Sequence, residues 1–396
     1  MSDILLESVS KRFGSILAVD QVSLRVEAGE LLVICGPSGS GKTTLLRLIA
    51  GLEEPSSGII RIAGRDVARC PPRERNLAMV FQQPALVPNK TVRWNWAFAL
   101  RAQRLSRRDQ QERIDATADA LEATALLDRR ADELSGGETQ RAALGRALVR
   151  QPAICLLDEP FSQVDAPSRA TLRRKLLELQ RQWNMTTLYV THDQWEAMAM
   201  ADRLLLMTAG RTMQLGTPEQ LYHWPASRAV AEFLGIPPMN FFRATLHRTD
   251  NTWRLETAGV SWCWHADQYP QVGQNGGIGQ VRSELVDVGI RAEDCLRYIA
   301  HTEALDGNHW REVPVQIVRR WMHGPWCFAD LRCDALDCNL TILDESLNSP
   351  GATNARREHS VENWNANGTS IDKIYMDLRR LHIFSRADGR RIYCTP

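Results

Sequence analysis

The sequence lacks most features that would assign it to a membrane span, a secreted protein or a nucleic-acid binder. None of its 396 residues fall in a run of 18 consecutive apolar side chains, which a bilayer-spanning helix needs. The formal net charge of +1 gives no sign of a nucleic-acid or membrane-surface partner. Asp3 and Glu7 precede any apolar run, which argues against a secretion signal. These absences indicate an ordinary globular protein, long enough for two or three domains.

The cysteines show no regular spacing. There are nine of them, an odd number, which favours reduced thiols in a cytoplasm over a disulfide framework. The group Cys327, Cys333 and Cys338 matches no zinc-binding spacing, so we interpret these residues as buried or incidental thiols.

Lysine is also scarce. It occurs only at positions 11, 42, 90, 175 and 373, so arginine supplies nearly all of the 48 basic residues. A lysine at a chemically sensitive position is therefore more informative here than in an average protein.

Short apolar runs alternate with helical patterns through the first part of the chain. Buried strands are predicted at 29–36, 76–82, 153–160, 186–193 and 202–211. Helices are predicted at 43–52, 107–127, 138–150 and 167–183. This alternation is typical of an α/β domain with a largely parallel sheet, which we assign to residues 1–235.

The pattern changes near residue 236. Segments 242–258 and 313–333 each predict a strand, a turn and a strand, and 374–385 predicts a final strand pair. The polar stretch 348–370 is predicted to be a surface loop. Residues 236–396 are therefore expected to form a small, mostly β domain of barrel or OB-like type.

A phosphate-binding loop follows the first predicted buried strand. "GPSGSGKTT" fits the pattern G-x-x-x-x-G-K-[ST] between a strand and a helix, and a chance glycine-rich turn is a much weaker explanation. Its backbone N–H groups and the helix N-terminus would hold phosphate oxygens. Lys42 would reach the outer phosphates, and Thr43 would offer a hydroxyl to Mg²⁺. The expected nucleotide-binding residues are Gly36, Pro37, Ser38, Gly39, Ser40, Gly41, Lys42, Thr43 and Thr44.

A second motif, "ICLLDEP", places two carboxylates at the end of an apolar strand. The carboxyl edge of a parallel sheet is where the phosphates would lie. Asp158 suits the Mg²⁺ shell, and Glu159 suits a general base that activates water. A solvated loop start is the alternative, and the upstream phosphate loop disfavours it.

Taken with "LSGGETQR" at 134–141, these motifs make residues 1–235 resemble the α/β P-loop ATPase subunit of an ATP-binding cassette (ABC) transporter, with a helical subdomain at about 84–150. The resemblance implies that Gln82 contacts Mg²⁺ and the catalytic site, that His192 contacts the γ-phosphate, and that Phe13 stacks on adenine. Asp165 matches the loop that follows the second phosphate motif, and is expected near the nucleotide.

The glycines of "LSGGETQR" leave N–H groups bare at the start of a helix, where a phosphate can approach closely. In the family this helix faces a nucleotide held by the other subunit, so Ser135, Gly136 and Gly137 are expected to complete a site shared by two chains. Glu138, where many relatives carry Gln, and Pro88-Asn89 depart from the family pattern without touching the chemistry.

Three aromatic residues in "TVRWNWAFAL" allow two interpretations. Trp94, Trp96 and Phe98 either pack the helical subdomain or form the surface on which a membrane partner docks.

The passage 221–242, with "DVGIRAED" and "LHIFS" further on, resembles maltose-type importer ATPases with a C-terminal regulatory domain; Ala292 stands where relatives commonly have Pro. The resemblance implies an ATP- and Mg²⁺-dependent ATPase at the cytoplasmic face of the inner membrane. Its expected partners are a second ATPase subunit, two membrane permease subunits and an extracytoplasmic solute-binding protein, and no nucleic acid.

Sugars, polyols or glycerol phosphates are the favoured cargo, while polyamine, iron or sulfate stay open. A non-transport ABC ATPase is disfavoured, since it would need two cassettes or a coiled-coil insertion. A pure ligand-sensing regulator is also disfavoured, because such a protein would lack a catalytic carboxylate and this chain has Glu159.

The scarcity of lysine generates a first prediction. Lys42→Arg should impair ATP binding or hydrolysis at least about tenfold, because a planar guanidinium cannot replace a compact ammonium inside the phosphate loop. Nucleotide binding and steady-state hydrolysis measure the effect. A fully active Lys42→Arg protein would show that the choice of lysine there carries no chemical meaning.

Overall fold

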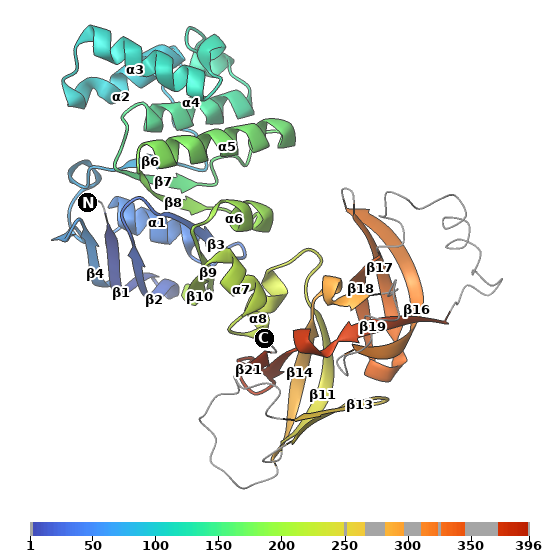
Figure 1. The fold of residues 1–396 in the computed structure, drawn as a ribbon. Helices are drawn as coiled ribbons and strands as arrows, with labels where there is room; N and C mark the ends of the chain where they lie inside the picture. Colours follow the sequence, from blue (N-terminus) through green and yellow to red (C-terminus); the bar gives the residue numbers. More distant parts are fainter. Residues whose placement is uncertain are drawn as a thin grey trace, which may run out of the picture. The chain divides into compact units, whose positions relative to one another are not determined.

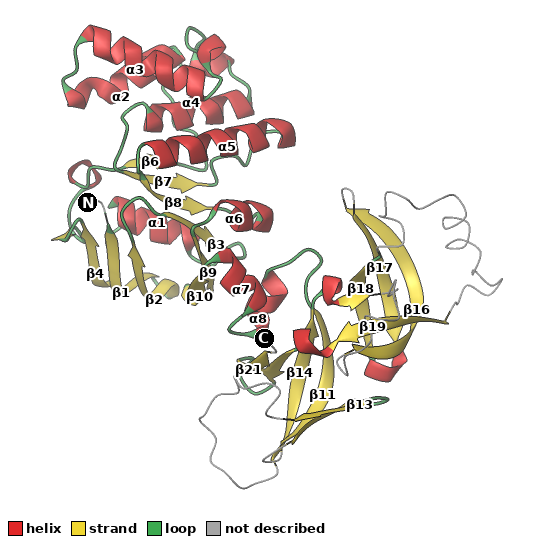
Figure 2. Cartoon of the chain, in the orientation of Figure 1, coloured by secondary structure: helices red, strands yellow, loops and turns green. Residues whose placement is uncertain are grey.

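The computed structural model describes residues 3–248, 252–265, 282–296, 310–323, 326–344 and 371–394. The chain divides into two compact units, Met1–Gln220 and Leu221–Pro396. The first mixes helices and strands, and the second is nearly all strand (Figure 1, Figure 2).

The first unit is built on a six-stranded sheet with the strand order β10-β9-β3-β8-β7-β6. Its strands are β3 (Leu31–Cys35), β6 (Ala78–Val80), β7 (Ile154–Asp158), β8 (Thr186–Val190), β9 (Arg203–Thr208) and β10 (Arg211–Gly216). All neighbours pair in parallel except β10 with β9. Every residue of β3, β7 and β8 is buried, as expected for parallel strands covered on both faces. The five predicted buried strands are thus confirmed.

The predicted helices of this unit are confirmed as well. They are α1 (Lys42–Ala50), α3 (Arg107–Ala120), α4 (Gly136–Leu148) and α5 (Ala166–Gln182). Two further helices, α2 (Val92–Leu100) and α6 (Gln194–Met200), were not singled out by the helical patterns.

A second, antiparallel sheet was missed by the sequence analysis. It has the order β2-β1-β4-β5, formed by β1 (Ile4–Phe13), β2 (Ile16–Val26), β4 (Ser57–Ile62) and β5 (Arg65–Asp66). The pairing of β1 with β2 shifts register between Leu6 and Val9 and again near Lys11. Such bulges interrupt the strict alternation of apolar and polar residues that identifies a strand in a sequence.

The aromatic residues of α2 have different environments. Trp96 is fully buried and donates a hydrogen bond from Nε1 to the carbonyl oxygen of Ala142 on α4, 2.8 Å away. A Cβ at Gly145 would overlap the Trp96 ring, so glycine is required there. Trp94 and Phe98 instead stack with ring centroids 5.2 Å apart, and Phe98 is half exposed. Of the two interpretations, core packing therefore holds for Trp96.

The second unit contains two antiparallel sheets around one apolar core. The first has the order β13-β12-β11-β14-β20-β21, with β11 (Asn240–Arg248), β12 (Thr252–Glu256), β13 (Ser261–His265), β14 (Arg282–Ile290), β20 (His382–Ser385) and β21 (Arg391–Cys394). The second has the order β15-β19-β16-β17-β18, with β15 (Cys295–Leu296), β16 (Trp310–His323), β17 (Trp326–Cys333), β18 (Cys338–Leu343) and β19 (Ile371–Asp377). The predicted mostly β character is confirmed.

One strand pair was predicted wrongly. The strands within 374–385 exist, but β19 pairs with β16 and β15, whereas β20 pairs with β14 and β21. A 3₁₀ turn at Leu378–Arg380 carries the chain from one sheet to the other. The predicted loop 348–370 lies outside the described residues.

The short helices after β10 belong largely with the second unit. Arg291 donates hydrogen bonds to the carbonyl oxygens of Tyr222, Ala231 and Leu234, and so ties α7 (Pro218–His223) and α8 (Arg228–Phe233) to the β domain. Ala231 also packs with Met239 and Phe384. The compact division accordingly falls after Gln220, ahead of the junction predicted at 235.

Among the described residues, no helix combines the length and the apolar composition needed to cross a bilayer.

This division generates a prediction about truncation. A chain ending after Thr217 should fold and bind ATP, because the phosphate motifs and both sheets of the first unit precede that point. A chain ending at 235 should aggregate more readily, since Leu221, Val230 and Leu234, all fully buried in the full chain, would lose their cover. Light scattering, thermal unfolding and nucleotide binding compare the two. A well-behaved chain 1–235 beside an insoluble chain 1–217 would assign α7 and α8 to the first unit.

Candidate functional site

The predicted phosphate loop lies between β3 and α1. Gly36, Pro37, Ser38, Gly39, Ser40 and Gly41 form the loop, and Lys42, Thr43 and Thr44 form the first turn of α1. Gly41 has φ +97°, and a Cβ there would overlap the carbonyl oxygen of Ala18. Glycine is thus required on both backbone and steric grounds.

Lys42 is held at the centre of this loop. Its Nζ donates to the carbonyl oxygens of Gly36 and Pro37, each 2.8 Å away, and the residue is only 7% exposed. Burial lowers the pKa of the ammonium, and the nearby acidic groups partly oppose that effect. An anion in the loop would supply the missing opposite charge.

Thr43 and Asp158 meet across the sheet edge. The hydroxyl of Thr43 donates to Oδ1 of Asp158 over 3.0 Å, which joins the start of α1 to the end of β7. Asp158 is 3% exposed, and burial raises the pKa of its carboxyl above the ordinary value, with Thr43 opposing the shift. The ionised carboxylate therefore lacks full compensation in this chain alone.

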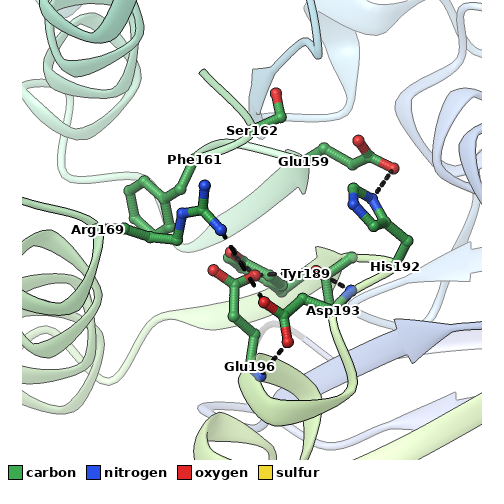
Figure 3. Close-up of a pocket in the computed structure, with 9 residues that line it drawn as sticks. Glu159, Phe161, Ser162, Arg169, Tyr189, His192, Asp193 and Glu196 are labelled. Atoms are coloured by element: carbon green, nitrogen blue, oxygen red, sulfur yellow. Dashed lines mark hydrogen bonds and ion pairs between the residues drawn. The ribbon is translucent and has the colours of Figure 1, made fainter. Parts of the chain in front are cut away.

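The three residues expected to be catalytic come together beside this pair. Oε2 of Glu159 accepts a hydrogen bond from Nε2 of Gln82 over 3.2 Å. Oε1 of Glu159 lies 3.1 Å from Nδ1 of His192, as Figure 3 shows. Glu159 has φ +47°, a left-handed conformation that is unfavourable for a residue with a Cβ. Its N–H bonds to the carbonyl oxygen of Val190, so the ends of β7 and β8 lie side by side.

Ser135 begins helix α4. Its hydroxyl accepts from the N–H of Glu138 over 3.3 Å, and the Glu138 carboxylate accepts from the N–H of Ser135 over 2.8 Å. This capping box is reinforced by an ion pair between Glu138 and Arg129 at 2.7 Å. Glu138, which the sequence analysis set aside, thus shapes the helix start. No hydrogen bond among the described residues uses the N–H of Gly136 or Gly137, or joins them to the phosphate loop.

The loop after β7 lies against α4. A Cβ at Gly136 would come within 3.1 Å of the Gln163 side chain, and Gln140 on α4 bonds to both Ser162 and the N–H of Gln163. Asp165, expected near the nucleotide, caps α5 by accepting from the N–H of Ser168 over 3.0 Å. Its observed contact is therefore a structural one.

Phe13 lies at the end of β1. It is 43% exposed, and Nζ of Lys11 lies 4.8 Å from the centroid of its ring. An exposed ring of this kind is available for stacking.

Sequence analysis missed a group of polar residues behind the Glu159–His192 pair. A cavity there is lined by Tyr189, Thr191, Glu196, Arg169 and Asp193 together with residues of the pair (Figure 3). Tyr189 and Thr191 are polar residues two positions apart in and just after the apolar run of β8, a signal that could have pointed to them.

The chain is similar to known proteins of one family. A family model described as "ABC transporter" matches residues 19–162. The trehalose/maltose import ATP-binding protein of Thermococcus litoralis is 38% identical over 99% of this chain and its own whole length. An sn-glycerol-3-phosphate import ATP-binding protein of Rhizobium etli is 50% identical over 77% of this chain and 83% of its own. The trehalose import ATP-binding protein of Mycobacterium tuberculosis is 48% identical over 62% of this chain and 63% of its own.

Solved structures are similar over the first part of the chain. A dimeric bacterial ABC transporter cassette superposes with a TM-score of 0.51 at 29% identity, covering 54% of this chain and 98% of its own. A dimeric post-hydrolysis state of an ATP-binding cassette, bound to ADP and Pi, gives a TM-score of 0.51 at 28% identity and the same coverage.

The environment of Asp158 generates a prediction about stability. Its folded-state pKa is raised, so the ionised side chain costs stability above that pKa, and the cost disappears below the unfolded value near 4. Asp158→Asn keeps an acceptor for Thr43 without the charge. It should raise the Tm of the nucleotide-free chain at pH 7 by about 2–4 °C, the shift that ~1 kcal/mol gives in a domain of this size, and abolish hydrolysis. Thermal unfolding at pH 7 and near pH 4.5 tests this: the gain should shrink at the lower pH. A lower Tm at pH 7 would contradict it.

Proposed function

The chain belongs to the ATP-binding subunits of ABC transporters, and from this premise we propose that it acts as a pair of copies that hydrolyse ATP to drive solute import. One observation carries the proposal. Glu159, Gln82 and His192 converge within hydrogen-bonding distance at the sheet edge that also holds Thr43 and Asp158. These groups suit the hydrolysis of ATP, and they follow four strands of one sheet, β3, β6, β7 and β8.

The phosphate loop would bind and orient ATP. Backbone N–H groups of residues 36–41 and the start of α1 would face the phosphate oxygens, and Lys42 would add its positive charge. Phe13, exposed at the end of β1, would stack on the adenine ring.

Glu159 would act as the general base. Its carboxylate accepts the proton of a water molecule as the water oxygen attacks the γ-phosphorus and ADP leaves. Gln82 binds one oxygen of this carboxylate and His192 binds the other. The base is therefore held in one orientation before the reaction begins. His192 would also contact the γ-phosphate from its exposed side.

The residues present fit Mg²⁺. A hydroxyl of Thr43, the carboxylate of Asp158 and the amide oxygen of Gln82 are oxygen ligands of the kind Mg²⁺ prefers. The buried Asp158, with its raised pKa, lacks a full complement of positive charge. When bound with ATP, Mg²⁺ would neutralise charge on the phosphate oxygens.

Each ATP site would be shared between two copies. The N–H groups of Gly136 and Gly137 have no partner among the described residues, and they lie at the start of a 13-residue helix, where anions bind. The contacts of Ser135 and its neighbours are with Glu138, Thr139 and the loop after β7, and the absence of a contact with the phosphate loop among the described residues supports a site completed by the second copy. The two solved structures cited above are of one cassette, which is dimeric in both.

The remaining assembly is inferred from the relatives. Import ATP-binding proteins would dock on two permease subunits at the cytoplasmic face of the inner membrane, supplied by an extracytoplasmic solute-binding protein. The stacked Trp94 and Phe98 with Arg101 over their rings form a partly exposed aromatic surface suited to such a contact. The relatives import trehalose, maltose or glycerol phosphate, which favours sugars, polyols or glycerol phosphates over polyamines, iron or sulfate.

Mixed dimers test the shared site. In a Glu159→Gln background, which should retain ATP without hydrolysing it, one chain carries Lys42→Ala and the other Ser135→Arg. Homodimers of either should fail to trap ATP, because each of their sites has one defect. The mixed dimer concentrates both defects in one site, so it should occlude about one ATP per dimer through the intact site.

Retention of labelled ATP after gel filtration measures occlusion, with mixed assembly verified by two affinity tags. The Glu159→Gln dimer without further changes is the positive control. A mixed dimer that traps no ATP would refute the shared site. Turnover in the Glu159→Gln chain near the unmodified level would refute the role of Glu159.

A further inference from the structure

A buried carboxylate, Glu196 on α6, lies behind the Glu159–His192 pair. We propose that Glu196 is a positioning residue: through Thr191 it fixes the backbone from which His192 reaches Glu159. This inference rests on the proposed function, because it assigns a residue that holds the catalytic histidine in place.

Glu196 is 4% exposed and is bound by hydroxyl groups. Its Oε2 accepts from the phenol of Tyr189 and from the hydroxyl of Thr191, each over 2.9 Å (Figure 3). Burial and the Glu196 charge raise the pKa of Tyr189 well above its ordinary value, so the phenol stays a donor. No arginine or lysine within the described chain forms an ion pair with Glu196.

The two hydroxyl groups come from one face of one strand. Tyr189 and Thr191 are two residues apart, so their side chains project to the same side of β8 and its extension. Thr191 is further tied by its N–H to the carbonyl oxygen of Ile34, and its hydroxyl accepts from the N–H of Asp193 over 3.0 Å. The residues on both sides of His192 are therefore fixed.

His192 itself has little else to hold it. Its side chain is 64% exposed, and the polar contact of its ring within the described residues is the 3.1 Å approach to Glu159. An exposed ring with one such contact follows the backbone that carries it. A small rotation at Thr191 would move Nδ1 out of hydrogen-bonding range of the base.

A second constraint joins the same loop to the loop after β7. Arg169 on α5 donates to the carbonyl oxygen of Val164 over 2.9 Å and lies 4.0 Å from the carboxylate of Asp193. Asp193 in turn caps α6 by accepting from the N–H groups of Trp195 and Glu196. Glu196, with Tyr189 and Thr191, thus lies between helix α5, which follows Glu159, and the loop that carries His192.

A purely structural role does not account for the choice of residue. A carboxylate buried against neutral hydroxyl groups loses hydration that they replace only in part, and an apolar residue could join α6 to β8 without that loss. A charged acceptor gives stronger and more directional hydrogen bonds, which orient Thr191 at the expense of stability.

Substitutions of the two hydroxyl donors form a matched test. Tyr189→Phe and Thr191→Val each remove one hydroxyl from the same carboxylate, but only Thr191 adjoins His192. Thr191→Val should lower kcat at least about tenfold with the KM for ATP within about twofold, whereas Tyr189→Phe should lower kcat by less than about threefold. Thr191→Ser keeps the hydroxyl and should restore most of the activity. Steady-state hydrolysis by the full-length chain, with Tm measured for every variant, gives these values.

A double-mutant cycle tests whether Glu196 acts through His192. Glu196→Gln should lower the single-turnover rate about tenfold in the unmodified chain, and by less than about twofold when His192 is already alanine. If Glu196 and His192 acted independently, Glu196→Gln would lower the rate about tenfold in the His192→Ala chain as well. Stoichiometric enzyme followed over hours resolves the slow His192→Ala rate, and should Glu196→Gln fail to fold, Thr191→Val replaces it in the cycle.

Several results would overturn the proposal. Equal losses from Tyr189→Phe and Thr191→Val, failure of Thr191→Ser to recover activity, or multiplying losses in the cycle would each make Glu196 a structural residue only. Failure of the proposed function looks different, because the unmodified chain would then hydrolyse no ATP and every variant would match it.

Discussion

The parallel pairing of β3, β8 and β7 is the constraint on which the rest of the site depends. Parallel strands end at one edge of a sheet, so the loops that follow them must meet there. Two backbone hydrogen bonds extend this order past the strands, from Glu159 to Val190 and from Thr191 to Ile34. They set Glu159 and the loop that carries His192 in register with the loop after β3.

The site holds several groups at a cost to stability. Burial lowers the pKa of Lys42 and raises the pKa of Asp158, and both shifts favour the neutral side chain. Glu159 adopts a left-handed backbone conformation. Each of these features would be relieved or used when a phosphate and a cation bind. Glu196 adds a buried carboxylate one layer behind. These features lower stability at the sheet edge where the loop after β3, Asp158 and Glu159 lie.

The second unit is organised by a different principle. Its two antiparallel sheets enclose one apolar core, and Arg291 binds the carbonyl ends of α7 and α8 to that core. The buried guanidinium of Arg291 and the packing of Ala231 against Met239 and Phe384 thus join the connecting helices to the second unit. The phosphate motifs all lie in the first unit.

The sequence by itself determined the phosphate loop, the paired carboxylates Asp158 and Glu159, and the glycines at the start of α4. These are local features, because glycine spacing and a strand-to-helix change dictate the backbone over a few residues. Matching them to a known family supplied Gln82 and His192. The parallel strands were predictable for a related reason: fully buried strands are continuous apolar runs.

Only the tertiary structure decided the features that depend on distant neighbours. The bulged strands β1 and β2 show no regular alternation of apolar and polar residues. Strands β19 and β20 belong to different sheets because each pairs with strands that are distant in the sequence. Trp96 and Phe98, two residues apart on α2, differ in burial because only one faces α4. Glu196 gains its role from hydroxyl groups on another element, and no short-range pattern records which buried partners a side chain will meet.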